Sequence, residues 1–187
     1  MEENEKEFLV HKIRDLKDHF AKGDIASLKS SGGDFAELAF LRQEKELVDF
    51  SIVAYSLAKF LEKPYILESS EWKDFSLKTA HDLEQCAIHL EHDQLKEYTE
   101  QLSAIISEIN KISFYLGRFT TSVVEKARIK AGAQMYAHGA SLGKAAYLSG
   151  AEKDELAKYI SETRLPEKYL SLSLAERLKK AEELFES

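Results

Sequence analysis

Four side chains in the middle of the chain have the types and spacing of metal ligands. They stand at i, i+4, i+7 and i+11 and are Asp82, Cys86, His89 and Asp93. On one helix these positions fall within a sector of about 60° and share a face, and all are ligand types for transition metals. One straight helix rarely closes such a site, and the chain has no Glu-x-x-His pattern of di-iron bundles. We therefore expect the polar, solvated side of an amphipathic helix, with no metal or cofactor.

Arg14 and His19, in RDLKDHF, carry the chemistry to act on a phosphodiester. A histidine transfers protons near neutral pH, and an arginine holds a phosphate. The Arg-x4-His spacing resembles the catalytic motif of helical HEPN-type ribonucleases, in which the pair acts on the RNA backbone. That motif usually lies near the end of its domain, whereas this one lies near the start, where Asp15 and Asp18 would repel phosphate. We expect an exposed helix of mixed charge instead.

Positive charge is concentrated in one segment of an acidic chain. The chain carries 26 Lys+Arg and 33 Asp+Glu, a net charge of −7. Residues 111–148 hold six basic side chains and one acidic one, a net of +5, whereas residues 1–110 hold 13 basic and 23 acidic ones, a net of −10. Such asymmetry is typical of a segment that faces nucleic acid. A solvated helix of mixed charge gives the same pattern.

The stretch SLGKAAYLSGAEKDELAKYI, residues 141–160, has the spacing of a helix-turn-helix. Ala146 stands four residues before Gly150, and Leu156 and Tyr159 follow in a second helical pattern. A small residue lets two helices approach closely, and glycine takes the backbone conformation that reverses the chain. An αα-hairpin used only for packing or protein contact has the same spacing.

A DNA-binding helix-turn-helix would take its phosphate contacts from the basic side chains on and before this motif. The predicted nucleic-acid-binding residues are Lys126, Arg128, Lys130, Lys144, Lys153 and Lys158. Acidic residues oppose this assignment, because Glu152, Asp154 and Glu155 crowd the start of the second helix, where a reading helix makes its base contacts.

Residues 141–166, SLGKAAYLSG followed by DELAKYISETRLP, resemble the helix-turn-helix of small prokaryotic antitoxins, which neutralise a ribonuclease toxin and repress their own operon. The resemblance covers about 25 of the 187 residues. It implies a DNA or toxin partner and no catalysis. Antitoxins of this kind are usually much shorter, so the long N-terminal part of the chain departs from the pattern.

The composition favours a cytoplasmic, all-α protein. Hydrophobic residues make up 44%, only two prolines occur, and the single cysteine excludes an internal disulfide. The acidic N-terminus lacks the layout of a signal peptide, and no apolar run is long enough to cross a membrane. The sequence has no Gly-rich phosphate loop, serine elbow or Cys-x-x-Cys pair, so enzymatic activity has no positive support.

Apolar periodicity predicts a helical bundle with one long heptad-patterned helix and a small C-terminal helix-turn-helix-like region. We expect a division into a bundle over 1–137 and a C-terminal region over 138–187. Asp24 is expected to cap a short helix that ends near Leu28, and a loop at 30–34 to follow it. The other expected helices span 5–21, 35–61, 75–92, 94–135, 141–149, 152–163 and 173–185.

The prediction of the long helix is based on an unbroken stripe of apolar residues in steps of three and four. The stripe, within 95–123, comprises Leu95, Tyr98, Leu102, Ile105, Ile109, Ile112, Leu116, Phe119 and Val123. It predicts packing against the chain's own helices or a homodimer through the same residues.

Two function classes remain open. One is a non-catalytic helix-turn-helix regulator or antitoxin-like protein that binds duplex DNA. The other is a helical protein-protein interaction module that binds no nucleic acid, favoured by the acidic body, the stripe and the acidic second helix.

Overall fold

The computed structural model describes residues 3–115 and 122–163. Every regular element in these two ranges is a helix, which confirms the all-α class. The helices, in chain order, are α1 (Glu3–Ala21), α2 (Ile25–Arg42), α3 (Lys45–Leu61), α4 (Pro64–Leu67), α5 (Trp72–Glu91), α6 (Leu95–Tyr115), α7 (Val123–Ala137), α8 (Leu142–Ser149) and α9 (Lys153–Thr163). The helix expected at 173–185 lies outside the described residues.

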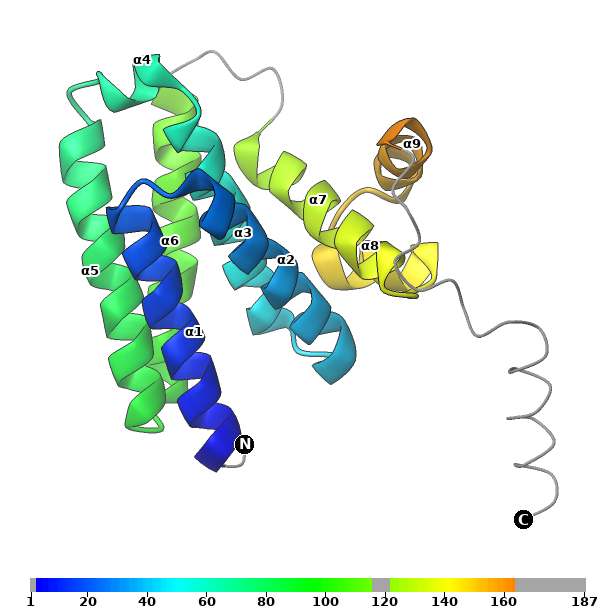
Figure 1. Cartoon of the computed structure of the whole chain (residues 1–187), viewed down its shortest axis with the longest axis horizontal. Helices are drawn as coiled ribbons and strands as arrows, with labels where there is room; N and C mark the ends of the chain where they lie inside the picture. Colours follow the sequence, from blue (N-terminus) through cyan, green and yellow to red (C-terminus); the bar gives the residue numbers. More distant parts are fainter. Residues whose placement is uncertain (1–2, 116–121, 164–187) are drawn as a thin grey trace, which may run out of the picture.

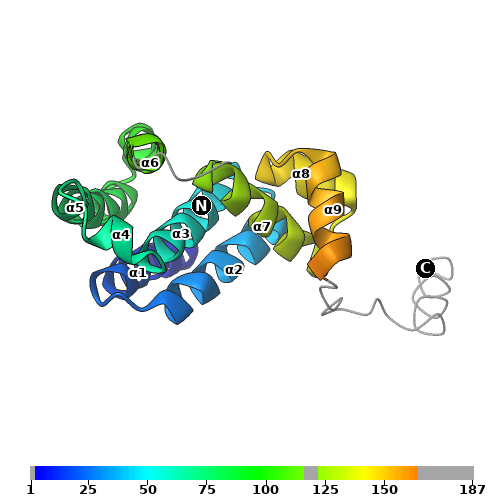
Figure 2. The same ribbon diagram turned by 90° about the horizontal axis from the view of Figure 1, so that it is seen from above.

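The helices form a row with α5 and α6 at one end and α8 and α9 at the other (Figures 1 and 2). Between them, α1 packs on α5, and α2 packs on α3. Helix α7 contacts α2 and α3 as well as α8 and α9, so it joins the two ends. None of the helices in 3–115 and 122–163 is long and apolar enough to cross a bilayer.

The helix expected at 35–61 is wrong as a single element. The chain leaves α2 at Gln43, whose backbone has φ of 60°, and α3 begins two residues later. Helix α3 is buried on most sides and is the central helix of the core. Two apolar helices packed side by side produce the same run of buried residues as one long helix. The apolar run over 35–61 therefore does not show that the helix breaks at Gln43.

The loop expected at 30–34 is also wrong, because α2 continues through it. Asp24 does cap this helix, accepting a hydrogen bond from the Ser27 backbone N–H at 3.0 Å. A Cβ on Gly32 would lie 3.1 Å from the ring of Tyr55, and the Ser51 hydroxyl donates to the Gly32 carbonyl at 2.7 Å. The glycines therefore let α2 and α3 pack closely, and do not end the helix.

The heptad-patterned helix is confirmed as α6, but its expected continuation to residue 135 is wrong. Helix α6 ends at Tyr115, and a separate helix, α7, starts at Val123. The stripe residues buried in the chain's own core are Tyr98, Leu102, Ile105, Ile109, Ile112 and Val123. Leu116 and Phe119 lie outside the described residues. These buried residues pack within the chain, as the intramolecular alternative expects, whereas Leu95 is 58% exposed. A homodimer through the stripe stays a prediction.

Helix α7 is built from small side chains on the faces that it buries. Its buried residues are Val123, Val124, Ala127, Ala131, Gly132, Ala133, Met135 and Ala137. Small side chains let neighbouring helices approach from several directions. One apolar core therefore runs continuously from α1 to α9. A domain division at residue 138 stays a prediction, and the core shows no break there.

Helices α8 and α9 approach α7 closely at Gly132. A Cβ at this position would lie 2.7 Å from Ser149 Oγ of α8 and 3.0 Å from Leu156 Cδ2 of α9. Both neighbours are buried, and Ser149 Oγ also accepts a hydrogen bond from the Ala151 N–H at 3.2 Å. An added methyl group must therefore displace these two buried side chains.

We predict that Gly132→Ala lowers the free energy of unfolding by about 1–3 kcal/mol, because it overpacks this contact. Urea unfolding followed by circular dichroism measures the change. Gly143→Ala in α8 is the control, since its Cβ would meet nothing within 4 Å; it should leave stability unchanged or raise it by up to about 1 kcal/mol. Equal effects of the two variants would contradict the packing described here.

Candidate functional site

The helix-turn-helix geometry at 141–160 is present. Ser141 caps α8, accepting a hydrogen bond from the Lys144 backbone N–H at 3.2 Å. Gly150 ends α8 in the left-handed conformation, with φ of 66°, and so reverses the chain. The carboxylate of Glu152 accepts hydrogen bonds from the backbone N–H groups of Asp154 and Glu155 at 2.8 and 3.0 Å, which fixes the start of α9. Glu152, one of the three acids that opposed DNA reading, thus caps this helix.

Three of the six predicted nucleic-acid-binding residues come together. Lys126 and Lys130 of α7 and Lys158 of α9 line one pocket. A fourth cation, Lys59 of α3, lines the same pocket and was not among the predicted residues. No local signal marks Lys59, because more than 60 residues separate it from Lys126 along the chain.

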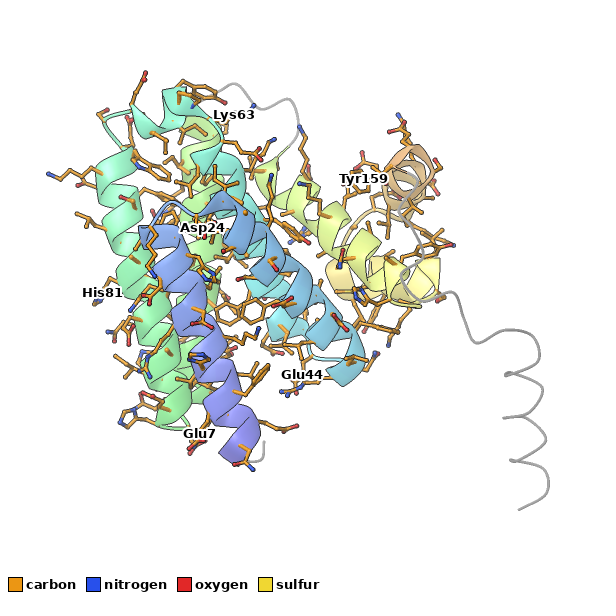
Figure 3. All side chains as sticks on the ribbon, viewed as in Figure 1. Glu7, Asp24, Glu44, Lys63, His81 and Tyr159 are labelled. Carbon is orange, nitrogen blue, oxygen red and sulfur yellow. The ribbon has the colours of Figure 1, made fainter. Side chains whose placement is uncertain are left out.

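This α3–α7–α9 pocket has a volume of about 470 Å³. Its apolar wall comes from Val123, Ala127 and Ile129 of α7, and two tyrosines, Tyr55 and Tyr159, add hydroxyl groups. Figure 3 labels Tyr159 on α9, on the side toward α7. Two acids, Glu155 and Glu162, also line the pocket, so four lysines and two glutamates give its lining a net charge of +2.

Among the four lysines of the pocket, Lys130 has a pKa that is shifted by its surroundings. Its ammonium lies 5.6 Å from the centre of the Tyr55 ring. Burial lowers the pKa of Lys130, and the nearby cations Lys29 and Lys59 lower it further, against the weaker attraction of Glu62. Glu62 is shared between Lys29 and Lys59, whose hydrogen bonds hold the pKa of this carboxyl at about 2. One carboxylate therefore serves two cations, and Lys130 faces an excess of positive charge.

Lys126 is exposed, and neither it nor Lys130 makes an ion pair within the described part of the chain. The other two lysines are partly neutralised. Lys59 Nζ lies 2.8 Å from Glu62 Oε2, and Lys158 Nζ lies 4.0 Å from Glu162 Oε1. Lys126 and Lys130 are thus the cations best placed to accept an anion.

The other three predicted contacts lie apart from this pocket. Arg128 lies against the turn, with Nε 3.7 Å from where a Gly150 Cβ would be, in a small cavity also lined by Glu125 and Glu152. Lys144 is exposed on α8, with its ammonium 5.7 Å from the ring of exposed Tyr147. Lys153 is exposed at the start of α9. The pocket therefore brings together three of the six predicted residues, and Arg128, Lys144 and Lys153 are not among its lining residues.

Arg128 faces a carboxyl group across the α3–α7 contact. Burial raises the pKa of Asp49 to about 6, against the opposing attraction of Lys45 and Arg128. The native state then binds a proton at pH values at which the unfolded chain, with a value near 3.8, has already lost it.

The expectation of an exposed helix around Arg14 and His19 is wrong in part. The Arg14 guanidinium makes two hydrogen bonds to Glu91, at 2.7 and 2.9 Å, and one to Glu84 at 3.1 Å. His19 Nδ1 lies 3.3 Å from Ser31 Oγ and is half-buried. These contacts join α1 to α5 and α2. Because two carboxylates occupy Arg14, a phosphate-holding role is not supported.

The solvated face expected at Asp82, Cys86, His89 and Asp93 is wrong for two of its members. Asp82 and Cys86 are buried, and burial raises the pKa of Asp82. Burial also raises the pKa of the Cys86 thiol to about 12, so the thiol stays protonated. Asp93 lies beyond the end of α5 and pairs with Lys6 at 3.0 Å. His89 contacts Gln94 Oε1 at 2.7 Å. Among the residues that the structure describes, no group of three metal-ligand types comes together.

No protein-family model, curated protein or solved structure matches this chain. The geometry of the pocket and of the helix-turn-helix is therefore the basis for a functional proposal.

The raised pKa of Asp49 leads to a pH-dependent prediction. Because the native state holds the Asp49 proton more tightly, the contribution of Asp49 to the free energy of unfolding should fall as pH rises from about 4 to about 6. Asp49→Asn removes this charge, so it should raise stability by about 1–3 kcal/mol at about pH 8 and have little effect at about pH 4. Urea unfolding at the two pH values measures this.

Asp18→Asn, at an exposed aspartate of α1, is the matched control. It should change stability by less than about 0.5 kcal/mol at either pH. A loss of stability in Asp49→Asn at high pH would show instead that the pairing with Arg128 outweighs burial.

Proposed function

We propose that this protein is a non-catalytic helix-turn-helix protein that binds the phosphate backbone of duplex DNA through α7–α9. One observation carries the proposal: Lys126 of α7 and Lys158 of α9 are exposed beside the helix-turn-helix and line a single pocket. Lysines contact phosphates as point charges and give affinity without sequence readout. The resemblance to small prokaryotic antitoxins supports the same function class.

The acidic start of α9 limits what kind of DNA binding is supported. Glu152, Asp154 and Glu155 are exposed where a recognition helix would meet base edges, and they repel phosphate. Their carboxylates favour the positive end of the helix dipole but not a DNA groove. We therefore propose contact with phosphates, and assign no base-reading residue.

A protein partner with a basic surface is the second candidate. Tyr147 is 80% exposed on α8, and exposed tyrosines are enriched at interfaces. It lies on the same helix-turn-helix as the exposed acids Glu152, Asp154 and Glu155. An antitoxin-like protein that binds a cationic toxin without DNA would use such a surface.

We predict that the protein binds random-sequence duplex DNA and that the affinity falls steeply between about 50 and 200 mM salt. The double variant Lys126→Glu/Lys158→Glu should weaken binding and reduce the slope of log K against log salt concentration by about 2, because two phosphate contacts are lost. Fluorescence anisotropy measures both quantities.

Lys96→Glu is the control, because Lys96 is equally exposed but lies at the start of α6, far from α9. It should leave the salt slope unchanged. Absence of binding at the lower salt concentration, or equal effects of the control and the double variant, would contradict DNA binding and leave the protein partner as the better candidate.

A further inference from the structure

The α3–α7–α9 pocket has the size and lining of a small-molecule site. Its volume of about 470 Å³ falls within the range of roughly 300–1,000 Å³ that such sites span. An apolar wall with a few convergent polar groups is the usual make-up of such a site. Val123, Ala127 and Ile129 supply the wall, while lysines and tyrosines supply the polar groups. A duplex backbone would touch the exposed rim of this pocket but would not fill it.

The charges of the pocket indicate an anion of limited charge. Lys130 is half-buried without a carboxylate partner in the described residues, which costs free energy as long as no anion is present. The net lining charge of +2 matches the −1.5 to −2 of a phosphate monoester near pH 7, taken as about −2. Glu155 and Glu162 would repel a more highly charged polyphosphate.

The remaining groups suit the rest of a nucleotide. Tyr159 and the apolar wall offer surface for a flat ring, and the two glutamates accept hydrogen bonds from ribose hydroxyl or base amino groups. The pKa of Tyr55 is raised to about 12, mainly by burial, so its hydroxyl keeps its proton and remains a donor.

We propose that this pocket binds a free nucleoside monophosphate, with Lys126 and Lys130 on the phosphate and Tyr159 beside the base. This site shares Lys126 with the proposed contact with duplex DNA, but nucleotide binding does not depend on DNA binding. The ligand would touch α3, α7 and α9 together and so hold α9 against the rest of the protein.

Isothermal titration calorimetry with AMP tests the proposal on the full chain. AMP should bind, and adenosine, which lacks the phosphate, should bind at least about tenfold more weakly. Lys130→Met keeps the length of the side chain and removes its charge, so it should weaken AMP binding by at least about tenfold. Lys126→Met should act in the same direction. Lys144→Met, an exposed lysine outside the pocket, is the matched control and should bind AMP normally.

Thermal unfolding without ligand shows whether Lys130→Met weakens binding by unfolding the protein. Because the Lys130 charge is half-buried and unpaired, this variant should melt at the same temperature as the original chain or higher. A lower melting temperature would contradict the electrostatic argument, and Lys126→Met then tests the binding by itself.

Binding of a short oligonucleotide, measured with and without a 5′-phosphate, distinguishes a site for a free nucleotide from a site for the end of a nucleic-acid strand. Binding of AMP in preference to both oligonucleotides supports the proposal. Three results would overturn it: no binding of AMP at millimolar concentration, equal binding of AMP and adenosine, or binding of only the 5′-phosphorylated oligonucleotide. Duplex binding that persists when AMP binding is absent would overturn this inference alone.

Discussion

The structure depends on the small side chains of α7. This helix packs on α2 and α3 and also on α8 and α9, and most of the residues that it buries are alanine or glycine. Gly132 permits the contact with Ser149 and Leu156, and Ala127 forms part of the wall of the α3–α7–α9 pocket. Because the side chains of α7 are small there, Lys59 of α3 and Lys158 of α9 line one pocket although they are 99 residues apart in sequence.

Much of the fold could be predicted from the sequence, and the two helices that were predicted too long share one physical cause. Apolar periodicity shows which residues are buried but not whether the helix that carries them is continuous. The stripe from Leu95 to Val123 keeps its spacing although α6 ends at Tyr115, because α6 and α7 bury residues in the same core. Ser122 is the N-cap residue of α7, and the preference of serine for this position could have indicated the start of a separate helix.

The candidate site was predicted in part. Lys126 and Lys130 are four residues apart and share a face of α7, whereas Arg128, two residues from each, projects to the other side and meets the turn at Gly150. Helical spacing alone could have separated Arg128 from the pair. The participation of Lys59 and the pairing of Arg14 with Glu84 and Glu91 are contacts between distant segments, which local spacing does not encode.

Native-state hydrogen exchange of the α7 amides tests most directly the claim that α7 joins the two ends of the molecule into one core and so forms the pocket. If α7 is held from both sides, the amides around Gly132 should exchange only through global unfolding, with the same free energy as those of α3. Exchange of α7, α8 and α9 together at a clearly lower free energy than α3 would show that the C-terminal helices open independently, and would contradict a preformed pocket.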